Sequence, residues 1–583
     1  MAQPLPAARL VRISRLADVQ AAGCLTAHVE GHTLALFAHG GQVHAVDNRC
    51  PHLGFPLQRG TVRDGILTCH WHHARFDLAS GGTFDLWADD VRAFPVQVRD
   101  GEVWVDLAGR DDPPAHQRRR LRDGLERDIP LVIAKAVIGL LEGGEGPAGP
   151  FRIGLDFGAR YRQAGWGPGL TIHTCMMNLL PYLDAGERPR AAYHGLAAVA
   201  GDCAGRPPRF PVRPLPAATA DLATLQRWFR QFVEVRDAEG AERCLVSALR
   251  AGAGPRQMAD LLFAAATDHR YLQGGHVADF TNKALEALDH AGWDYAEPVL
   301  SSLASGYATA GRMEESNAWR HPVDLVALLE RAFEALPAAL SAGRGRRGAW
   351  SGREALVPVL LGEDAQAIAG ALLAALREGA SEEEVAGAVA YAAALRVARF
   401  HTDNEFGDWD TALHSFTFAH AVHQGLRRSP SPELLRGAFD AALSVYLDRF
   451  LNVPAARLPE PGGSVECPEA VLAELPGLLD RQQQVNEAGA LVARYLRGGG
   501  QPERLLAVLG QVLLREDRDF HTVQMVEAAF RQYGLLRGAP AGANVLVAAA
   551  RYLAAHAPTV RAQGQTYQIA RRLQRGERLH DEG

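Results

Sequence analysis

The sequence predicts a multidomain protein in which a small all-β domain is followed by a large all-α domain. Three observations support this prediction. The chain has 583 residues, whereas a single hydrophobic core stops growing near about 250–300 residues. The first hundred residues are short β-favouring runs separated by turn residues. Almost every later segment places apolar residues at helical spacing.

The β domain is predicted from the stretch between Leu10 and Leu107, where short apolar runs alternate with turn dipeptides. Gly40-Gly41, Asp64-Gly65 and Asp100-Gly101 favour two-residue hairpin turns, because both residues of such turns take positive φ. The spacing therefore predicts antiparallel hairpins, and we place this domain at residues 1–112.

The character of the chain changes after this domain. Asp111-Asp112-Pro113-Pro114 leads into an arginine-rich stretch, so we expect residues 113–128 to form a charged linker that runs into an exposed helix. Segments such as 368–376 then carry Ala and Leu at helical spacing. We expect an all-α domain over residues 129–574 and a C-terminal tail over 575–583.

The predicted all-α domain contains weak internal similarity. Residues 266–280, 400–414 and 515–521 each read as a helix, a polar turn and another helix. Such recurrence is typical of stacked helical pairs.

Composition excludes several classes of protein. An apolar fraction of 47% and a charged fraction of 22% are typical of globular chains. A net charge of −6 gives no reason to expect a nucleic-acid or anionic-membrane partner. The longest apolar runs, 129–141 and 356–361, are shorter than the roughly 20 residues that span a bilayer. Seven scattered cysteines do not form a disulfide framework, and the N-terminus lacks a signal-peptide pattern, so we expect a cytoplasmic protein.

Two short motifs carry the clearest chemistry. Cys50-Pro51-His52 and Cys69-His70-Trp71-His72 are separated by sixteen residues and supply two thiolates and two imidazoles. A Rieske 2Fe-2S centre uses this ligand set, with both thiolates on one iron and both imidazoles on the other. The alternative is a structural zinc site, since Cys₂His₂ sets also bind Zn²⁺. The C-x-H spacing and the all-β setting favour the cluster.

The stretches Cys50–Gly54 and Trp71–Asp77 resemble the two cluster-binding loops of the Rieske ferredoxin family. The resemblance implies that Cys50, His52, Cys69 and His72 hold one 2Fe-2S cluster per chain. His70 and His73 stand where the ferredoxin-type loop commonly has proline and glycine. A glycine at the second position would often serve positive φ.

High-potential respiratory Rieske proteins differ from this chain in ways that bear on its redox potential. They carry an extra cysteine in each loop, where this chain has Phe55 and Trp71, so no bracing disulfide is expected. They also use serine and tyrosine hydroxyls to hydrogen-bond cluster sulfurs, where this chain has Ala74 and Phe76. Fewer such hydrogen bonds favour the oxidised cluster, so the comparison implies a low, ferredoxin-like potential.

Ring-hydroxylating oxygenases resemble this chain only in the first domain, and their catalytic iron is held by two histidines and one carboxylate. The nearest analogue here is Asp410, His414, His420 and His423 on one predicted helix. His420 lies about 120° round the helix from His414, so this helix alone does not converge them on a metal. The sequence therefore does not assign a ring hydroxylase.

Ligands could instead come from several helices, as in the metal sites of helical bundles. A lone histidine of this kind is more often a hydrogen-bonded core residue, and a second metal in the helical domain stays open. The histidines and their neighbours considered are His173, His194, His269, His276 with Asp279, His401 with Asp403, His414 and His521. The candidate catalytic residues are His269, His276, Asp279, His401, Asp410 and His414.

Phe157–Tyr161, Trp166–Thr171 and Tyr193–Leu196 resemble segments of the questin oxidase-like family, helical proteins linked to oxidation of polyketide-type aromatics. The sequence contains no phosphate-binding loop or dinucleotide-binding fingerprint, so we expect a separate reductase or ferredoxin as electron donor.

Taken together, the sequence predicts a Rieske electron-transfer protein. We expect an oxidoreductase that delivers electrons to a site or a small-molecule substrate in its helical domain. Two alternatives stay open. One is a redox-responsive binding or scaffold protein, and the other is a simple electron carrier with a helical appendage.

Overall fold

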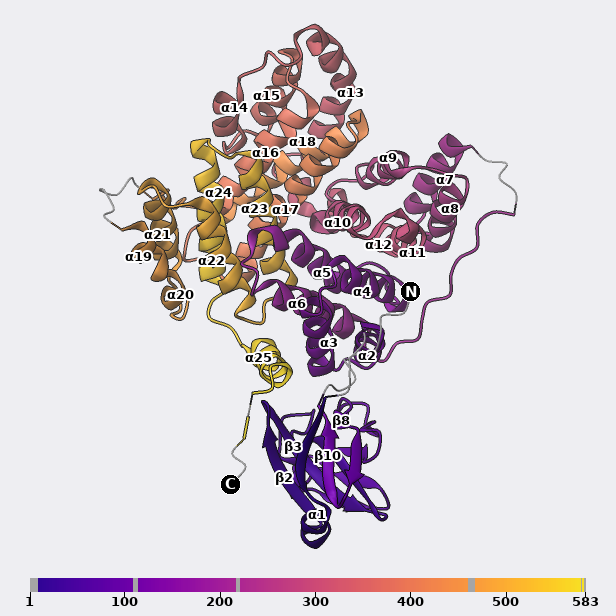
Figure 1. Cartoon of the computed structure of the whole chain (residues 1–583). Coiled ribbons are helices and arrows are strands. Elements are labelled where there is room, and N and C mark those ends of the chain that lie inside the picture. The colour runs from indigo at the N-terminus through magenta and orange to yellow at the C-terminus, as the bar shows by residue number, and fades with distance from the viewer. Residues whose placement is uncertain (1–8, 108–113, 217–220, 460–466, 578, 581–583) are drawn as a thin grey trace. The chain divides into compact units, whose positions relative to one another are not determined.

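The computed structural model describes residues 9–107, 114–216, 221–459, 467–577 and 579–580 (Figure 1). They belong to two compact units. The first unit comprises Met1–Ile153 and Ala562–Gly583, and we call it the β-containing unit. The second comprises Gly154–Arg561, and we call it the helical unit. Both ends of the chain therefore contribute to the β-containing unit.

In its described residues, the β-containing unit starts with ten strands in three antiparallel sheets, accompanied by a short helix α1 (Leu16–Ala22) that the sequence did not predict. The first sheet has the order β1 (Leu10–Arg15), β10 (Glu102–Asp106), β9 (Val96–Arg99). The second has the order β2 (Cys24–Val29), β3 (His32–His39), β4 (Gln42–Asp47), β8 (Ala93–Phe94). The third has the order β5 (Thr61–Arg63), β6 (Ile66–Thr68), β7 (Arg75–Asp77). The predicted small β domain is confirmed.

The predicted hairpin turns are also confirmed. Gly40-Gly41 joins β3 to β4, Asp64-Gly65 joins β5 to β6, and Asp100-Gly101 joins β9 to β10. All six residues have positive φ, from 50° to 79°, as the two-residue turn requires. Glu30-Gly31 forms a fourth turn of this kind between β2 and β3, at φ 48° and 82°. It was not predicted, because glutamate rarely takes positive φ.

Strand β3 separates two apolar cores, since successive side chains of a strand point to opposite faces. Leu34 and Leu36 pack into a core with residues of β4 and β10. Ala35 and Phe37 pack into the second core. The second core also contains Cys50 and Cys69, so the predicted cluster residues are built into the interior of the domain.

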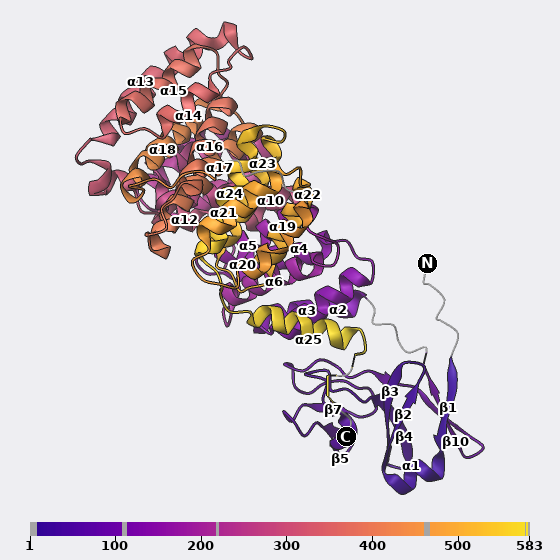
Figure 2. The ribbon, with the colours of Figure 1, turned by 90° about the vertical axis from the view of Figure 1, so that its left-hand side faces the viewer.

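Three helices, and the first residues of a fourth, α4 (Ala148–Tyr161), complete the described part of the β-containing unit (Figure 2). Helix α3 (Pro130–Glu142) packs against α2 (Pro114–Arg127) and against α25 (Ala562–Gln574) from the far end of the chain. The expected charged linker, residues 113–128, differs from this structure: its described part is helix α2, in which Arg120 and Leu121 are buried. Residue 113 and tail residues 578 and 581–583 lie outside the described residues.

All regular secondary structure in the described part of the helical unit is helical, which confirms the predicted all-α region. Helices α16, α17, α18, α23 and α24 pack against one another in its middle, and α10 packs against α17 (Figure 1). None of the described helices has both the length and the apolar character needed to cross a membrane. The helices from α4 onward are α4 (Ala148–Tyr161), α5 (Pro168–Leu179), α6 (Arg188–Cys203), α7 (Leu222–Glu234), α8 (Ala238–Arg250), α9 (Pro255–Ala266), α10 (His276–Ala291), α11 (Ala296–Ser301), α12 (Ala304–Thr309), α13 (Leu325–Gly343), α14 (Arg353–Leu360), α15 (Ala365–Arg377), α16 (Glu382–Ala398), α17 (Phe406–Arg428), α18 (Pro432–Leu447), α19 (Pro468–Ala473), α20 (Leu475–Leu478), α21 (Val485–Arg497), α22 (Pro502–Leu514), α23 (Phe520–Leu535) and α24 (Pro540–Ala555).

The three weakly similar segments each fold as expected, with a helix, a turn and a second helix. They correspond to α9 and α10, to α16 and α17, and to α22 and α23. Polar caps mark several of these starts. The Ser381 hydroxyl accepts from the Glu384 amide to begin α16, and the Asp519 carboxylate accepts from the Thr522 amide to begin α23. Such caps satisfy the free amides of a first helical turn.

Candidate metal-cluster site

Two loops of the β-containing unit carry the predicted cluster residues. Cys50 and His52 follow β4, and Cys69 and His72 connect β6 to β7. The loops are closed in the same way. The Cys50 amide donates to the Phe55 carbonyl at 2.8 Å, and the Cys69 amide donates to the Ala74 carbonyl at 2.9 Å. In both loops the acceptor lies five residues after the cysteine. This repeated closure gives each loop a similar shape.

The two sulfur atoms are adjacent and buried. Cys50 is 2% exposed and Cys69 is 1% exposed. The hydrogen bond from the Cys50 thiol lowers the pKa of the Cys69 thiol to about 6, and it raises the pKa of Cys50. Backbone amides of His52 and Leu53 also donate to the Cys50 sulfur, and amides of Trp71 and His72 donate to the Cys69 sulfur. These donors favour the thiolate, which is the form that binds metal.

The two imidazoles lie beside each other, nearer to the surface. The ring centroids of His52 and His72 are 4.8 Å apart, and Trp87 packs edge-on against His52. His52 is half-buried and His72 is exposed. Burial, together with the charges of His72 and Lys135, lowers the pKa of His52 to about 4. His52 Nδ1 is buried and has no hydrogen-bond partner among the described residues.

These features fit a Rieske-type 2Fe-2S cluster. The sulfur pair is buried and the imidazole pair lies toward solvent. His52 Nδ1 is buried without a hydrogen-bond partner among the described residues, and an iron ion would be a partner for it. The donor set of two thiolates and two imidazoles is that of the Rieske centre.

Comparison with known proteins agrees with this geometry. A family model for the Rieske [2Fe-2S] domain matches residues 9–95. The ferredoxin component of the p-cumate 2,3-dioxygenase system of Pseudomonas putida is 33% identical over 79 residues, which cover 13% of this chain and 67% of the relative. This chain belongs to the Rieske [2Fe-2S] family. Its Rieske domain holds a 2Fe-2S cluster.

Other relatives share only this domain-sized region. The 4beta-methylsterol monooxygenase of Methylococcus capsulatus is 36% identical over 87 residues, which cover 13% of this chain and 23% of the relative. The chain spans only 12–23% of the length of the larger curated relatives that it matches. Among solved structures, the ferredoxin of carbazole 1,9a-dioxygenase from Nocardioides aromaticivorans is 27% identical, with a TM-score of 0.16, and the match covers 17% of this chain and 96% of that chain.

An ion-pair network braces the first loop of the Rieske domain. Asp89 accepts hydrogen bonds from Arg120 at 2.7 Å and from Lys135 at 2.8 Å. Lys135 also donates to the Pro51 carbonyl, at 3.3 Å, between Cys50 and His52. Helix α3 thus holds the backbone of the Cys50 loop through a single lysine side chain.

His580, the last residue that the structure describes, reaches the same region. The His580 ring lies 4.7 Å from the Trp71 ring, centroid to centroid, and His580 Nε2 donates to the Leu53 carbonyl at 2.9 Å. Part of the predicted tail is therefore ordered against the first loop.

The departures from the family pattern have clear structural outcomes. His73 has φ 64°, a positive value that a glycine would adopt easily at this position. Phe55 and Trp71 stand where high-potential relatives carry the bracing disulfide, and their ring centroids are 5.8 Å apart. Ala74 and Phe76 are fully buried in the core that contains both cysteines. Neither side chain can donate a hydrogen bond to a sulfur.

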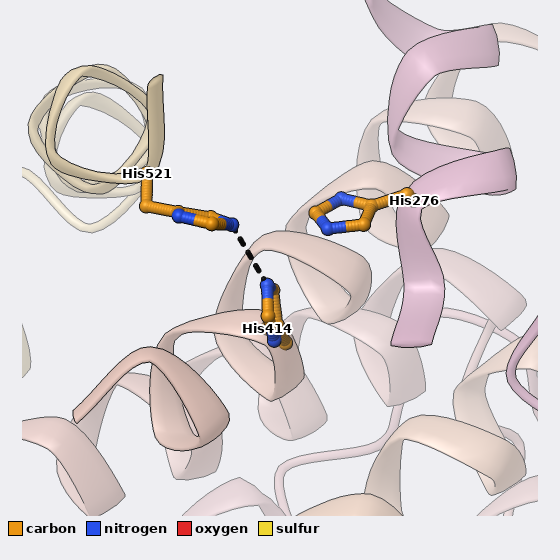
Figure 3. Close-up of side chains that lie close together, drawn as sticks. All are labelled: His276, His414 and His521. Atoms are coloured by element: carbon orange, nitrogen blue, oxygen red, sulfur yellow. Dashed lines mark hydrogen bonds between the residues drawn. The ribbon is translucent and has the colours of Figure 1, made fainter. Parts of the chain in front are cut away.

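In the helical unit, three predicted histidines come together (Figure 3). His276, His414 and His521 project from α10, α17 and α23 into one space, with potential ligand atoms all within 4.8 Å of one another. Burial and the two neighbouring rings lower the pKa of His276 to about 3. Burial and His521 lower the pKa of His414 to about 4. His276 and His414 are therefore neutral near pH 7.

Asp410 lies beside this group. Its Oδ2 is 3.9 Å from His521 Nδ1, and its Oδ1 accepts from the Tyr552 hydroxyl at 2.5 Å. His556 Nε2 lies 3.6 Å from Asp410 Oδ1. Tyr552, His556 and the capping residue Asp519 were not among the predicted site residues. The one local signal that could have indicated Asp519 was its position two residues before the candidate His521.

Other candidates lie elsewhere. His269 Nδ1 bonds Glu314 at 2.6 Å, Asp279 accepts from the Gln524 amide, and His401 pairs with Asp403 at 3.4 Å. His173 and His194 are buried on α5 and α6. His420 and His423 share α17 with Asp410 and His414, but both bond the Gln532 amide, so the four do not converge.

Proposed function

We propose that this chain is an electron-transfer protein in which Cys50, His52, Cys69 and His72 bind the 2Fe-2S cluster. The observation that carries the proposal is the pairing of two buried sulfurs with two imidazoles on matched loops. The cluster would supply one-electron chemistry. The protein's own contribution is to bury the thiolate side, to donate backbone amides to both sulfurs, and to leave the His72 edge open to a partner.

The ligand assignment can be tested within one loop. His72→Ala in the full-length chain should abolish the EPR signal of the reduced Rieske cluster and lower the bound iron, because it removes one ligand. His70→Ala and His73→Ala are matched controls, since both are exposed histidines of the same loop. They should keep the signal. A cluster that survives His72→Ala but is lost in His73→Ala would contradict the assignment.

We further propose that electrons enter from a separate reductase or ferredoxin and leave to a site or small molecule in the helical unit. The relatives support such an electron-transfer chain, because one is the ferredoxin component of a dioxygenase system and another is a monooxygenase. The convergence of three histidines on neighbouring helices supports an acceptor in this unit.

An anaerobic reductive titration of the full-length protein tests the acceptor. A Rieske cluster takes one electron per chain. An additional redox centre would take up further reducing equivalents, which the titration counts directly. Uptake of a single equivalent per chain would favour the simple carrier instead.

A further inference from the structure

Three helices of the helical unit each present one histidine to a common point. His276 is the first residue of α10, His521 is the second residue of α23, and His414 lies in α17. The ring centroids of His276 and His414 are 4.7 Å apart, and those of His414 and His521 are 4.8 Å apart (Figure 3). Each histidine comes from one of the three weakly similar helix-turn-helix segments.

The backbone before His276 is held in an unusual conformation. Tyr271, Gln273, Gly274 and Gly275 all have positive φ, between 45° and 91°. A side chain at Gly275 would bring its Cβ to 2.7 Å from the Cβ of Phe418. Positive φ at non-glycine residues costs of order 1–3 kcal/mol each and tends to mark functional positions. This strained turn fixes where α10 begins and so where the His276 ring points.

The His521 ring is oriented by a carboxylate. Its Nδ1 lies 3.2 Å from Oδ2 of Asp519, the residue that caps α23. A carboxylate at this nitrogen keeps the proton there, which leaves Nε2 with a free lone pair. Histidines that bind metals are commonly held in this way, with the non-binding nitrogen donating to a carboxylate. His521 Nε2 then faces His414.

The separation of the two facing nitrogens suits adjacent ligands of one metal ion. His414 Nε2 and His521 Nε2 are 3.0 Å apart. With metal–nitrogen bonds of about 2.1 Å, adjacent ligands are about 3.0 Å apart in octahedral and about 3.4 Å apart in tetrahedral geometry. A direct N–H···N hydrogen bond between His414 and His521 would also explain this distance, but such a bond would not need a third imidazole. The His276 ring lies beside both of them, as a third metal ligand would.

We propose that His276, His414 and His521 bind one divalent first-row transition-metal ion. Three imidazole nitrogens suit Fe, Zn, Cu or Ni rather than Mg or Ca. Asp410 and Asp519 lie on the Nδ1 side of His521, away from the facing Nε2 atoms, so they orient ligands rather than bind the ion. The site is therefore a three-histidine site, distinct from the two-histidine, one-carboxylate triad of ring hydroxylases. Only its role as electron acceptor rests on the proposed function.

Co²⁺ binding to the full-length protein tests the site. After dialysis against a chelator, the wild type should bind one Co²⁺ per chain with visible d–d absorption. His276→Ala, His414→Ala and His521→Ala should each weaken binding at least tenfold. His401→Ala is the matched control, because this half-exposed histidine belongs to the same unit but lies outside the group. It should bind as the wild type does.

A milder variant separates metal binding from folding. Asp519→Asn keeps a good helix cap but removes the carboxylate from His521, and loss of such a partner typically weakens metal affinity about 10- to 100-fold. Circular dichroism should show an unchanged fold. No bound Co²⁺ in the wild type, or equal binding in the wild type and all three histidine variants, would overturn the proposal.

The Rieske signal is recorded on every sample, so that the two proposals fail separately. A normal cluster without Co²⁺ binding overturns the three-histidine site alone. Retained Co²⁺ binding in His72→Ala supports the site independently of the cluster.

Discussion

Replacing Asp89 with asparagine should loosen helix α3 from the Rieske domain. The Asp89, Arg120 and Lys135 side chains are at most 15% exposed. Burial raises the pKa of Asp89, but Lys135 and Arg120 outweigh burial and lower it from 3.8 to about 2. Since one pKa unit corresponds to about 1.36 kcal/mol, the ionised carboxylate contributes roughly 2.4 kcal/mol at neutral pH. Asparagine keeps the shape and removes this contribution.

Hydrogen exchange with mass spectrometry measures the effect in the full-length protein. A loss of about 2.4 kcal/mol makes the exchange of α3 amides about 60-fold faster if their opening breaks the ion pairs. Asp123→Asn is the matched control. It removes a carboxylate 3.4 Å from the same Arg120, but the Asp123 side chain is 45% exposed. Exposed pairs contribute about 0–1 kcal/mol, so the control should accelerate exchange only a few fold.

The pH dependence supplies a second check. The folded-state pKa of Asp89 lies below its unfolded value, so the stabilisation is present above about pH 3.8 and is lost as pH falls towards 2. The difference between wild type and Asp89→Asn should therefore stay constant from pH 8 to pH 5. Exchange of α3 within threefold of wild type, or a difference that disappears by pH 6, would refute the reasoning.

Three further predictions follow from buried positions. Ala74→Ser and Phe76→Tyr should each raise the cluster potential by about 60 mV in protein-film voltammetry, because a hydrogen bond that favours the reduced state by about 1.4 kcal/mol shifts a one-electron couple by 59 mV. An unchanged potential in both would contradict this. Lys283→Met should destabilise the helical unit by about 3–5 kcal/mol in chemical denaturation, since it leaves the two buried carboxylates Glu286 and Glu527 with a single cation, Arg531. A loss below about 1 kcal/mol would argue against it. Gly275→Ala should lower the melting temperature, because φ is 91° there and the added Cβ clashes. An equal or higher melting temperature would show that the turn relaxes.

Local chemistry explains which parts of the fold could be predicted. The hairpins follow from dipeptides such as Asp64-Gly65, whose turn preference depends only on their own backbone. The Rieske motif is equally local, because the four proposed ligands lie within 23 residues, from Cys50 to His72. The positive φ of His73 also follows from its place in that loop.

Long-range pairing explains what could not be predicted. Arg120 belongs to a charge run that resembles a solvated linker, and its partner Asp89 lies 31 positions earlier. The same holds for the histidine group. His276, His414 and His521 were each candidates, but they are separated by more than a hundred residues, and no sequence pattern indicates which three of many histidines meet. Both lysines of the chain, Lys135 and Lys283, proved to lie in such long-range ion-pair networks.

The packing of α25 against α3 has a consequence for synthesis on the ribosome. The 408 residues of Gly154–Arg561 separate α25 from the rest of its unit. At about 5–20 residues per second, α3 waits roughly 20–80 s for this partner. During that time the nascent α3 lacks the helix that covers it in the finished protein. A fragment that ends at residue 153 would keep α3 in this uncovered state permanently and should be prone to aggregation.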